Sequence, residues 1–82
     1  MKWKELVFKS HPYIEGGIQC RIDFPNGYRI SIVGGGRGLY GDGIQSFEVW
    51  STITEKSHDG VKGYQTKKQV LAHINYLRNK EE

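Results

Sequence analysis

The residues best placed to do chemistry lie in a glycine-rich segment, residues 34–43, which holds six glycines in ten positions. Backbone N–H groups in glycine-rich turns can form an anion-binding concavity. Arg37 could clamp a phosphate or a carboxylate there, and Leu39 and Tyr40 could anchor the segment. The spacing matches neither a P-loop nor a dinucleotide-binding fingerprint, because no Gly-Lys-Ser/Thr and no helix follows. The segment is therefore either a flexible connection between strands or a loop that contacts a partner.

Two lysines form a second candidate anion site. Lys67 and Lys68 stand in the first turn of a helix predicted over residues 67–79. Lysine opposes the helix dipole at this end, where acidic residues are favoured, and an anion bound at the helix N-terminus would explain the choice. The dipole effect is only about 0.3–1 kcal/mol, so two solvated lysines are an equally good reading.

No set of residues points to catalysis or to a metal site. His11, His58 and His73 are far apart in the sequence, and with Cys20 as the only cysteine they make no zinc-binding pattern. No histidine, carboxylate and nucleophile stand out as a triad. We expect a protein that is not an enzyme and that uses no metal or cofactor. Cys20 lies on the apolar face of a predicted strand, which indicates a buried, inert thiol and fits a reducing compartment.

A β-hairpin is the element around which these residues are arranged. Apolar residues alternate along residues 18–24 and 28–33, on either side of a Pro-Asn-Gly turn. A two-residue turn would mix the two faces, whereas a three-residue turn places Phe24 across from Tyr28. Gly27 would then occupy the left-handed position that follows a type I turn, as a bulge.

The remaining elements are a first strand, a further core strand and a helix. Residues 4–9 predict the first strand, with a helical turn as the alternative, and residues 46–53 alternate as the further strand. Residues 54–65 are polar, with turn signals. Thr66 opens the helix with a capping-box pattern, and the apolar stripe of the helix is Val70, Leu71, Ile74 and Leu77.

Length and composition limit the fold to a small core. The chain has 82 residues, a formal net charge of +3 and 37% hydrophobic residues. A chain of this length buries only roughly 60–65% of its unfolded surface. We therefore expect one α+β domain over residues 1–82, with a three- or four-stranded antiparallel sheet packed against one C-terminal helix. The charge permits an acidic partner and is equally typical of small soluble domains.

Aromatic and basic residues suggest a binding surface on the sheet. Trp50 and Trp3 are candidates for the face opposite the helix, together with Arg21 and Arg29. Aromatic and arginine side chains on an open sheet form a platform for single-stranded nucleic acid, and they are also typical of protein-binding hot spots. The alternative is that the first strand or the glycine-rich segment covers Trp50.

Several short motifs resemble those of a group of small bacteriophage-encoded proteins of unknown function. The resemblance covers roughly residues 24–77 and rests on Gly27-Tyr28-x-x-Ser31-Ile32-Val33, on Tyr40-Gly41, and on Phe47-Glu48-Val49 with a helix after Gly63-Tyr64. The chain departs from the group at Arg29, where glycine is usual, and in residues 57–65, where an acidic segment is common. The resemblance implies a viral accessory protein acting in the host cytoplasm, and it assigns no activity or site.

Two functions follow as expectations. The first is a non-enzymatic accessory protein that binds and modulates a host protein, with inhibition of an anti-phage defence system as the expected role. The second is a nucleic-acid- or nucleotide-binding module that uses Arg37, Lys67, Lys68 and the glycine-rich segment. No apolar run reaches the roughly 18 residues of a transmembrane helix, so we expect no membrane partner. The sequence leaves the oligomeric state open.

Overall fold

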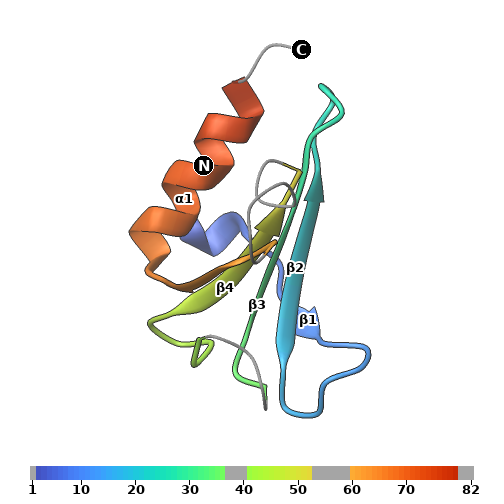
Figure 1. The fold of residues 1–82 in the computed structure, drawn as a ribbon, viewed down its shortest axis with the longest axis vertical. Helices are drawn as coiled ribbons and strands as arrows, with labels where there is room; N and C mark the ends of the chain where they lie inside the picture. The colour runs from blue at the N-terminus through green and yellow to red at the C-terminus, as the bar shows by residue number, and fades with distance from the viewer. Residues whose placement is uncertain (1, 37–40, 53–59, 80–82) are drawn as a thin grey trace.

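The computed structural model describes residues 2–36, 41–52 and 60–79. Its sheet has five antiparallel strands in the order β1-β2-β3-β4-β5, and a C-terminal helix lies across one face of the sheet (Figure 1). The expected α+β class is confirmed, but the sheet has five strands rather than three or four. The elements are the 3-10 helix η1 (Trp3–Glu5), β1 (Lys9–Ser10), β2 (Ile18–Asp23), β3 (Arg29–Gly34), β4 (Phe47–Ser51), β5 (Lys62–Gln65) and α1 (Lys67–Asn79).

The central hairpin has the predicted three-residue turn. Strand β2 pairs with β3 so that Asp23 lies opposite Arg29. Beyond the paired strands, the Phe24 N–H donates to the Tyr28 carbonyl at 2.8 Å. Gly27 has φ of +90°, a backbone region that glycine occupies at no steric cost. The turn prediction is therefore confirmed.

Alternation along the strands places one apolar face under the helix. Buried residues from β2, β3 and β4 meet the apolar stripe of α1, and the half-buried side chains of Trp3, Leu6 and Phe8 close one side of this core. The buried hydrophobic core comprises Cys20, Phe24, Ile30, Ile32, Phe47, Val49, Val70, Ile74 and Leu77.

The N-terminal segment differs from the strand predicted over residues 4–9. Residues Trp3–Glu5 form a 3-10 turn, and pairing with β2 is limited to Lys9 and Ser10. The carboxylate of Glu5 accepts the Lys2 N–H at 2.8 Å, which favours the turn. The Trp3 ring packs on Phe47 at 4.8 Å between centroids, so tertiary packing overrides the short alternating pattern.

Strand β5 lies in the stretch expected to be polar turns. It pairs with β4 at Phe47–Gln65 and Val49–Lys62, with a shift in register between the two pairs. Tyr64 has φ of +53°, so the backbone of the strand is irregular. Its sequence, Lys-Gly-Tyr-Gln, also has no alternation of apolar and polar residues from which a strand would be predicted. The predicted strand over residues 46–53 corresponds to β4, and residue 53 lies outside the described residues.

Helix α1 is capped at both ends by side chains. Thr66 and Gln69 form the predicted capping box, with the Thr66 N–H donating to Gln69 Oε1 at 2.8 Å and the Gln69 N–H donating to Thr66 Oγ1 at 3.2 Å. At the other end, Asn26 Nδ2 donates to the Leu77 carbonyl at 2.8 Å. The hairpin turn therefore holds the C-terminal end of the helix.

Candidate functional site

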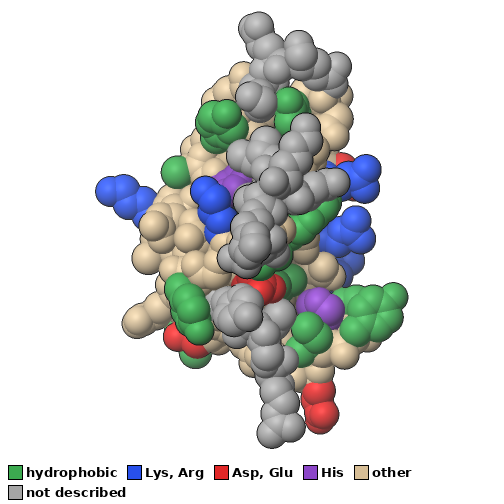
Figure 2. Space-filling view, in the orientation of Figure 1, with side chains coloured by type: hydrophobic (Ala, Val, Ile, Leu, Met, Phe, Trp, Pro, Cys, Tyr) green, Lys and Arg blue, Asp and Glu red, His purple; other side chains and the backbone are tan. Residues whose placement is uncertain are grey.

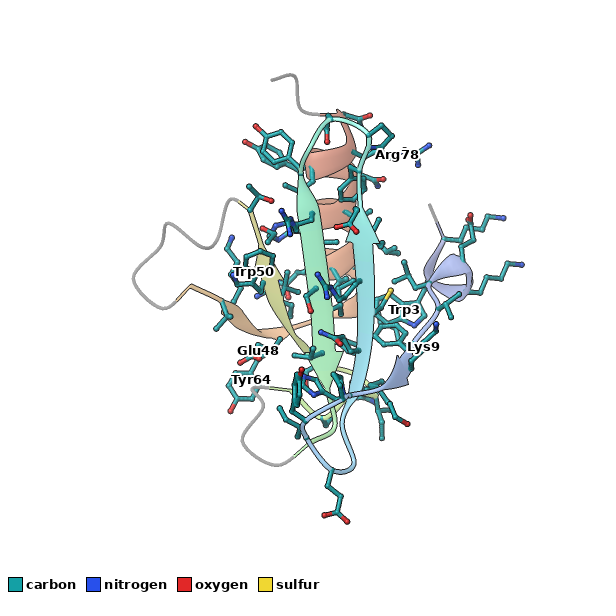
Figure 3. All side chains as sticks on the ribbon, turned by 90° about the vertical axis from the view of Figure 1, so that its right-hand side faces the viewer. Trp3, Lys9, Glu48, Trp50, Tyr64 and Arg78 are labelled. Carbon is teal, nitrogen blue, oxygen red and sulfur yellow. The ribbon has the colours of Figure 1, made fainter. Side chains whose placement is uncertain are left out.

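The face of the sheet that points away from α1 carries most of the candidate binding residues. Figure 3 looks onto this face with the helix behind it, and it shows Trp50, Glu48 and Tyr64 toward one edge and Lys9 toward the other. We call this surface the open face. From β2, β3 and β4 it presents Gln19, Arg21, Asp23, Arg29, Ser31, Val33, Glu48 and Trp50.

A row of three residues crosses the middle of the open face. Ser31 in β3 lies opposite Arg21 in β2 and opposite Trp50 in β4. Adjacent strands are about 4.8 Å apart, so the arginine and the tryptophan flank a short serine side chain. Gln19 Nε2 donates to Ser31 Oγ at 3.0 Å. The row therefore places a cationic residue on one side of Ser31 and an aromatic residue on the other.

Charges of both signs lie on the open face. Arg21 and Arg29 are exposed, Asp23 is exposed, and Glu48 is half-buried. Asp23 and Arg29 are cross-strand neighbours, so part of the arginine charge is matched within the sheet. Figure 2 views the molecule with the sheet close to edge-on, and from that side the lysine and arginine side chains stand in separate groups rather than in one stripe. This pattern resembles a protein-binding surface more than a phosphate-backbone track.

A cationic pocket adjoins the open face at its β1 edge. Lys9 lies opposite Gln19 in the β1–β2 pair, so the lysine shares this face. The pocket has a volume of about 510 Å³, and the described residues that line it include no carboxylate. An acidic side chain of a partner would fit this pocket, since Lys9 and Arg21 both line it and could pair with a carboxylate. Its lining residues are Val7, Lys9, Ser10, Pro12, Gln19 and Arg21.

Tyr64 lies at the opposite edge with an unusual backbone. Its φ of +53° is left-handed, which costs roughly 1–2 kcal/mol for a residue with a side chain. The side chain is 68% exposed. A strained residue that leaves a large aromatic side chain in solvent is a candidate contact residue.

The structure separates the candidate residues that the sequence suggested. Trp50, Arg21 and Arg29 share the open face, whereas Lys67 and Lys68 are exposed at the start of α1, in the helix layer. The expectation that Trp3 lies on the open face is wrong, because its ring packs against Phe47 on the helix side. Arg37, Leu39 and Tyr40 lie outside the described residues.

The described ends of the glycine-rich segment are closely packed. A Cβ on Gly34 would lie 2.7 Å from Gly43 Cα, and a Cβ on Gly41 would lie 2.7 Å from the Phe47 backbone. Glycine is therefore required sterically at both places. The Gly35 N–H donates to the Gly41 carbonyl at 3.1 Å, so the two ends of the segment are joined by a hydrogen bond.

Asp42 organises the turn that follows. Its Oδ1 accepts the backbone N–H groups of Ile44, Gln45 and Ser46 at 2.8–3.0 Å. These bonds favour the carboxylate and lower the pKa of Asp42 to about 2. The turn fixes the position of Ile44, whose side chain is 70% exposed.

A serine and a histidine lie within hydrogen-bond distance inside the helix–sheet layer. Ser51 Oγ and His73 Nε2 are 2.9 Å apart. This geometry resembles that of a nucleophile and its base, but Ser51 is fully buried and a substrate has no access to its hydroxyl. The pair acts as a polar bridge between β4 and α1. His73 falls within the helix predicted over residues 67–79, but the sequence could not identify its partner.

The part of the chain that the structure describes contains no cluster of three or more histidine, cysteine, aspartate or glutamate residues that could hold a metal ion. Within the same residues, α1 is too short and too polar to cross a bilayer. Cys20 is buried and forms no disulfide with a described residue, and burial raises the pKa of its thiol.

Comparisons with protein-family models, with characterised proteins and with solved structures gave no match. The open face and the cavities around it are therefore the features that bear on function.

Only part of the candidate site could be predicted from the sequence. Alternation along residues 18–33 correctly predicted that Arg21 and Arg29 point outward. The contribution of Lys9 and Gln19 to a cationic pocket was missed. The pairing of β1 with β2 spans only two residue pairs, which is too short to be predicted from sequence. The outward position of Gln19 was the one sequence signal for this pocket.

Proposed function

We propose that this protein is a non-catalytic binding module that docks its open face onto another protein. The observation that carries the proposal is the row Arg21–Ser31–Trp50 across three strands. Tryptophan, tyrosine and arginine are the residues most enriched in interface hot spots. A sheet fixed by backbone hydrogen bonds presents them with little loss of conformational entropy on binding.

The cationic pocket indicates the chemistry of the partner. Lys9 and Arg21 flank a cavity of about 510 Å³ beside the Trp50 row. A partner that presents an apolar group to Trp50 and an acidic side chain to this pocket would be complementary to both. The resemblance to phage-encoded proteins adds the proposal that the partner is a host protein, such as a component of an anti-phage defence system.

The decisive experiment compares two charge reversals of similar exposure. Immobilised wild-type protein, Arg29→Glu and Lys68→Glu are each incubated with host lysate. We expect a partner that is retained by wild type and by Lys68→Glu but reduced at least about tenfold with Arg29→Glu, because only Arg29 lies on the open face. Hydrogen exchange of the complex should then show protection in β2–β4. Equal recovery by Arg29→Glu, or protection confined to α1, would contradict the proposal.

Nucleic-acid binding is the alternative use of the same residues, because arginine and tryptophan also stack on bases. A fluorescently labelled single-stranded oligonucleotide separates the two functions by anisotropy. We expect no binding at about 150 mM salt. Binding that weakens steeply between about 50 and about 200 mM salt, and that Arg29→Glu abolishes, would favour the nucleic-acid function.

A further inference from the structure

A second cavity lies where the N-terminal segment, the start of β4 and the start of α1 meet. It has a volume of about 330 Å³ and shares no residue with the open face. Pockets of this size that are mostly apolar, with a few placed polar groups, are typical of small-molecule sites. The cavity is lined by Trp3, Phe8, Ile18, Gly43, Ile44, Phe47 and Lys67.

Three aromatic rings form a fixed wall of this cavity. The centroids of Trp3 and Phe47 are 4.8 Å apart, those of Trp3 and Phe8 are 5.6 Å apart, and those of Phe8 and Phe47 are 5.8 Å apart. Each ring contacts the other two, and Phe47 is anchored in the core with 2% exposure. An apolar ligand would therefore meet a preformed surface rather than one that must be ordered on binding.

Ile44 adds an exposed apolar side chain to the lining. It is 70% exposed, and its backbone N–H is held by Asp42 Oδ1 at 2.8 Å. A large exposed aliphatic side chain beside an aromatic cavity gains buried area when a ligand enters.

Lys67 supplies the one charge among the described residues that line the cavity. Its Nζ lies 5.6 Å from the centroid of the Trp3 ring, a cation–π distance. Among the described residues, the ring is the contact found for this ammonium group, and no described carboxylate pairs with it. An ammonium group has three N–H donors, so donors remain for a ligand anion.

We propose that this cavity binds a small amphipathic monocarboxylate. The apolar part of the ligand lies against the Trp3, Phe8 and Phe47 rings, and its carboxylate pairs with Lys67 Nζ. A volume of about 330 Å³ is at the small end of ligand pockets, and 3-phenylpropionate, with one ring and one carboxylate, is a probe of matching chemistry. The inference is independent of the proposed protein-binding function.

The test uses three probes with one carbon skeleton: 3-phenylpropionate, 3-phenylpropanol and 3-phenylpropylamine. Each is titrated into the folded protein with Trp50→Phe, so that the fluorescence of Trp3 reports on the cavity. We expect the carboxylate to bind about three- to tenfold more tightly than the alcohol, and the amine to bind most weakly. Equal affinities for carboxylate and alcohol, or no binding up to about 10 mM, would overturn the proposal.

Two matched substitutions locate the charge effect. Lys67→Met keeps an apolar stem of similar length and should remove the preference for carboxylate while leaving the affinity for the alcohol within about twofold. Lys68→Met, at the adjacent exposed position outside the lining, should keep the preference. The same loss in both variants would refute the assignment of Lys67.

A third substitution tests the apolar part of the site. Ile44→Ser should weaken all three probes by at least about threefold without a change in melting temperature, because the side chain is already exposed. Unchanged binding of the carboxylate in this variant would place the ligand elsewhere. The comparison of the three probes in the Trp50→Phe protein does not depend on the substitutions at Ile44, Lys67 or Lys68.

Discussion

At the scale of single residues, the Ser51–His73 pair is a titratable contact inside the helix–sheet layer. His73 is half-buried on α1, and Ser51 is fully buried on β4. Burial lowers the pKa of His73, and the positive charge of Lys62 lowers it further. The folded protein therefore favours the neutral imidazole.

We expect the free energy of unfolding to decrease as the pH falls below about 6.5, the ordinary pKa of histidine. The pKa of His73 is lower in the folded protein, so the unfolded chain takes up the proton first. The contribution of His73 is thus fully present above about pH 6.5 and is lost as the pH falls through the lowered pKa. Urea denaturation at several values between about pH 8 and about pH 5 measures this slope.

The control for this prediction is His73→Gln, which should flatten the slope over the same range. An unchanged slope in the variant would assign the effect to another group. Asp42 titrates separately, because its folded pKa of about 2 lies below the ordinary 3.8. Its contribution is present above about pH 4 and is lost at more acidic pH.

At the scale of elements, the hairpin turn and the helix are joined by Asn26. Its amide donates to the Leu77 carbonyl at 2.8 Å, and its Oδ1 accepts the Tyr28 N–H at 3.2 Å. The last carbonyl groups of a helix have no partner within the helix. Asn26, which is 51 positions away in sequence, therefore supplies a hydrogen-bond donor to one of these carbonyl groups.

Asn26→Ala should lower the free energy of unfolding by about 0.5–1.5 kcal/mol, the usual net value of such a hydrogen bond. Asn26→Asp should be more destabilising than alanine, because a carboxylate cannot donate to the Leu77 carbonyl and its charge faces the negative end of the helix. Chemical denaturation of the three proteins measures both differences. An aspartate variant as stable as wild type would show that the cap has no energetic role.

At the scale of the whole molecule, one face of the sheet and one stripe of the helix provide most of the core. Val70, Ile74 and Leu77 of α1 are fully buried, whereas Leu71 is half-buried at the side of the contact. Trp3, Phe8 and Phe47 extend the core at the start of β4. Stability therefore depends on a thin layer in which the loss of a single fully buried side chain is costly.

Ile74→Ala should lower the free energy of unfolding by about 2–5 kcal/mol, because it leaves a cavity under the helix. Leu71→Ala removes a side chain of the same size and should cost less than about 2 kcal/mol, because its site can collapse or hydrate. Urea midpoints of both variants at pH 7 test this ranking. Equal losses would mean that the helix is rotated relative to the sheet.

The sequence by itself determined the local elements whose signals lie close together in the chain. It predicted the hairpin register and Gly27, because alternation permits a single turn length that keeps apolar residues on one face. It also predicted the Thr66 capping box and the stripe of α1, because both follow from spacing within one helix. The α+β class follows from the order of these elements.

Tertiary structure decided the rest. The turn at Trp3–Glu5, the irregular strand β5 and the Ser51–His73 bridge depend on contacts between distant residues. Both cavities arise where separate segments of the chain meet, and no single stretch of sequence carries that information. Trp3 illustrates the reason: burial of its ring against Phe47 outweighs a weak local strand preference, since tertiary packing routinely overrides propensity.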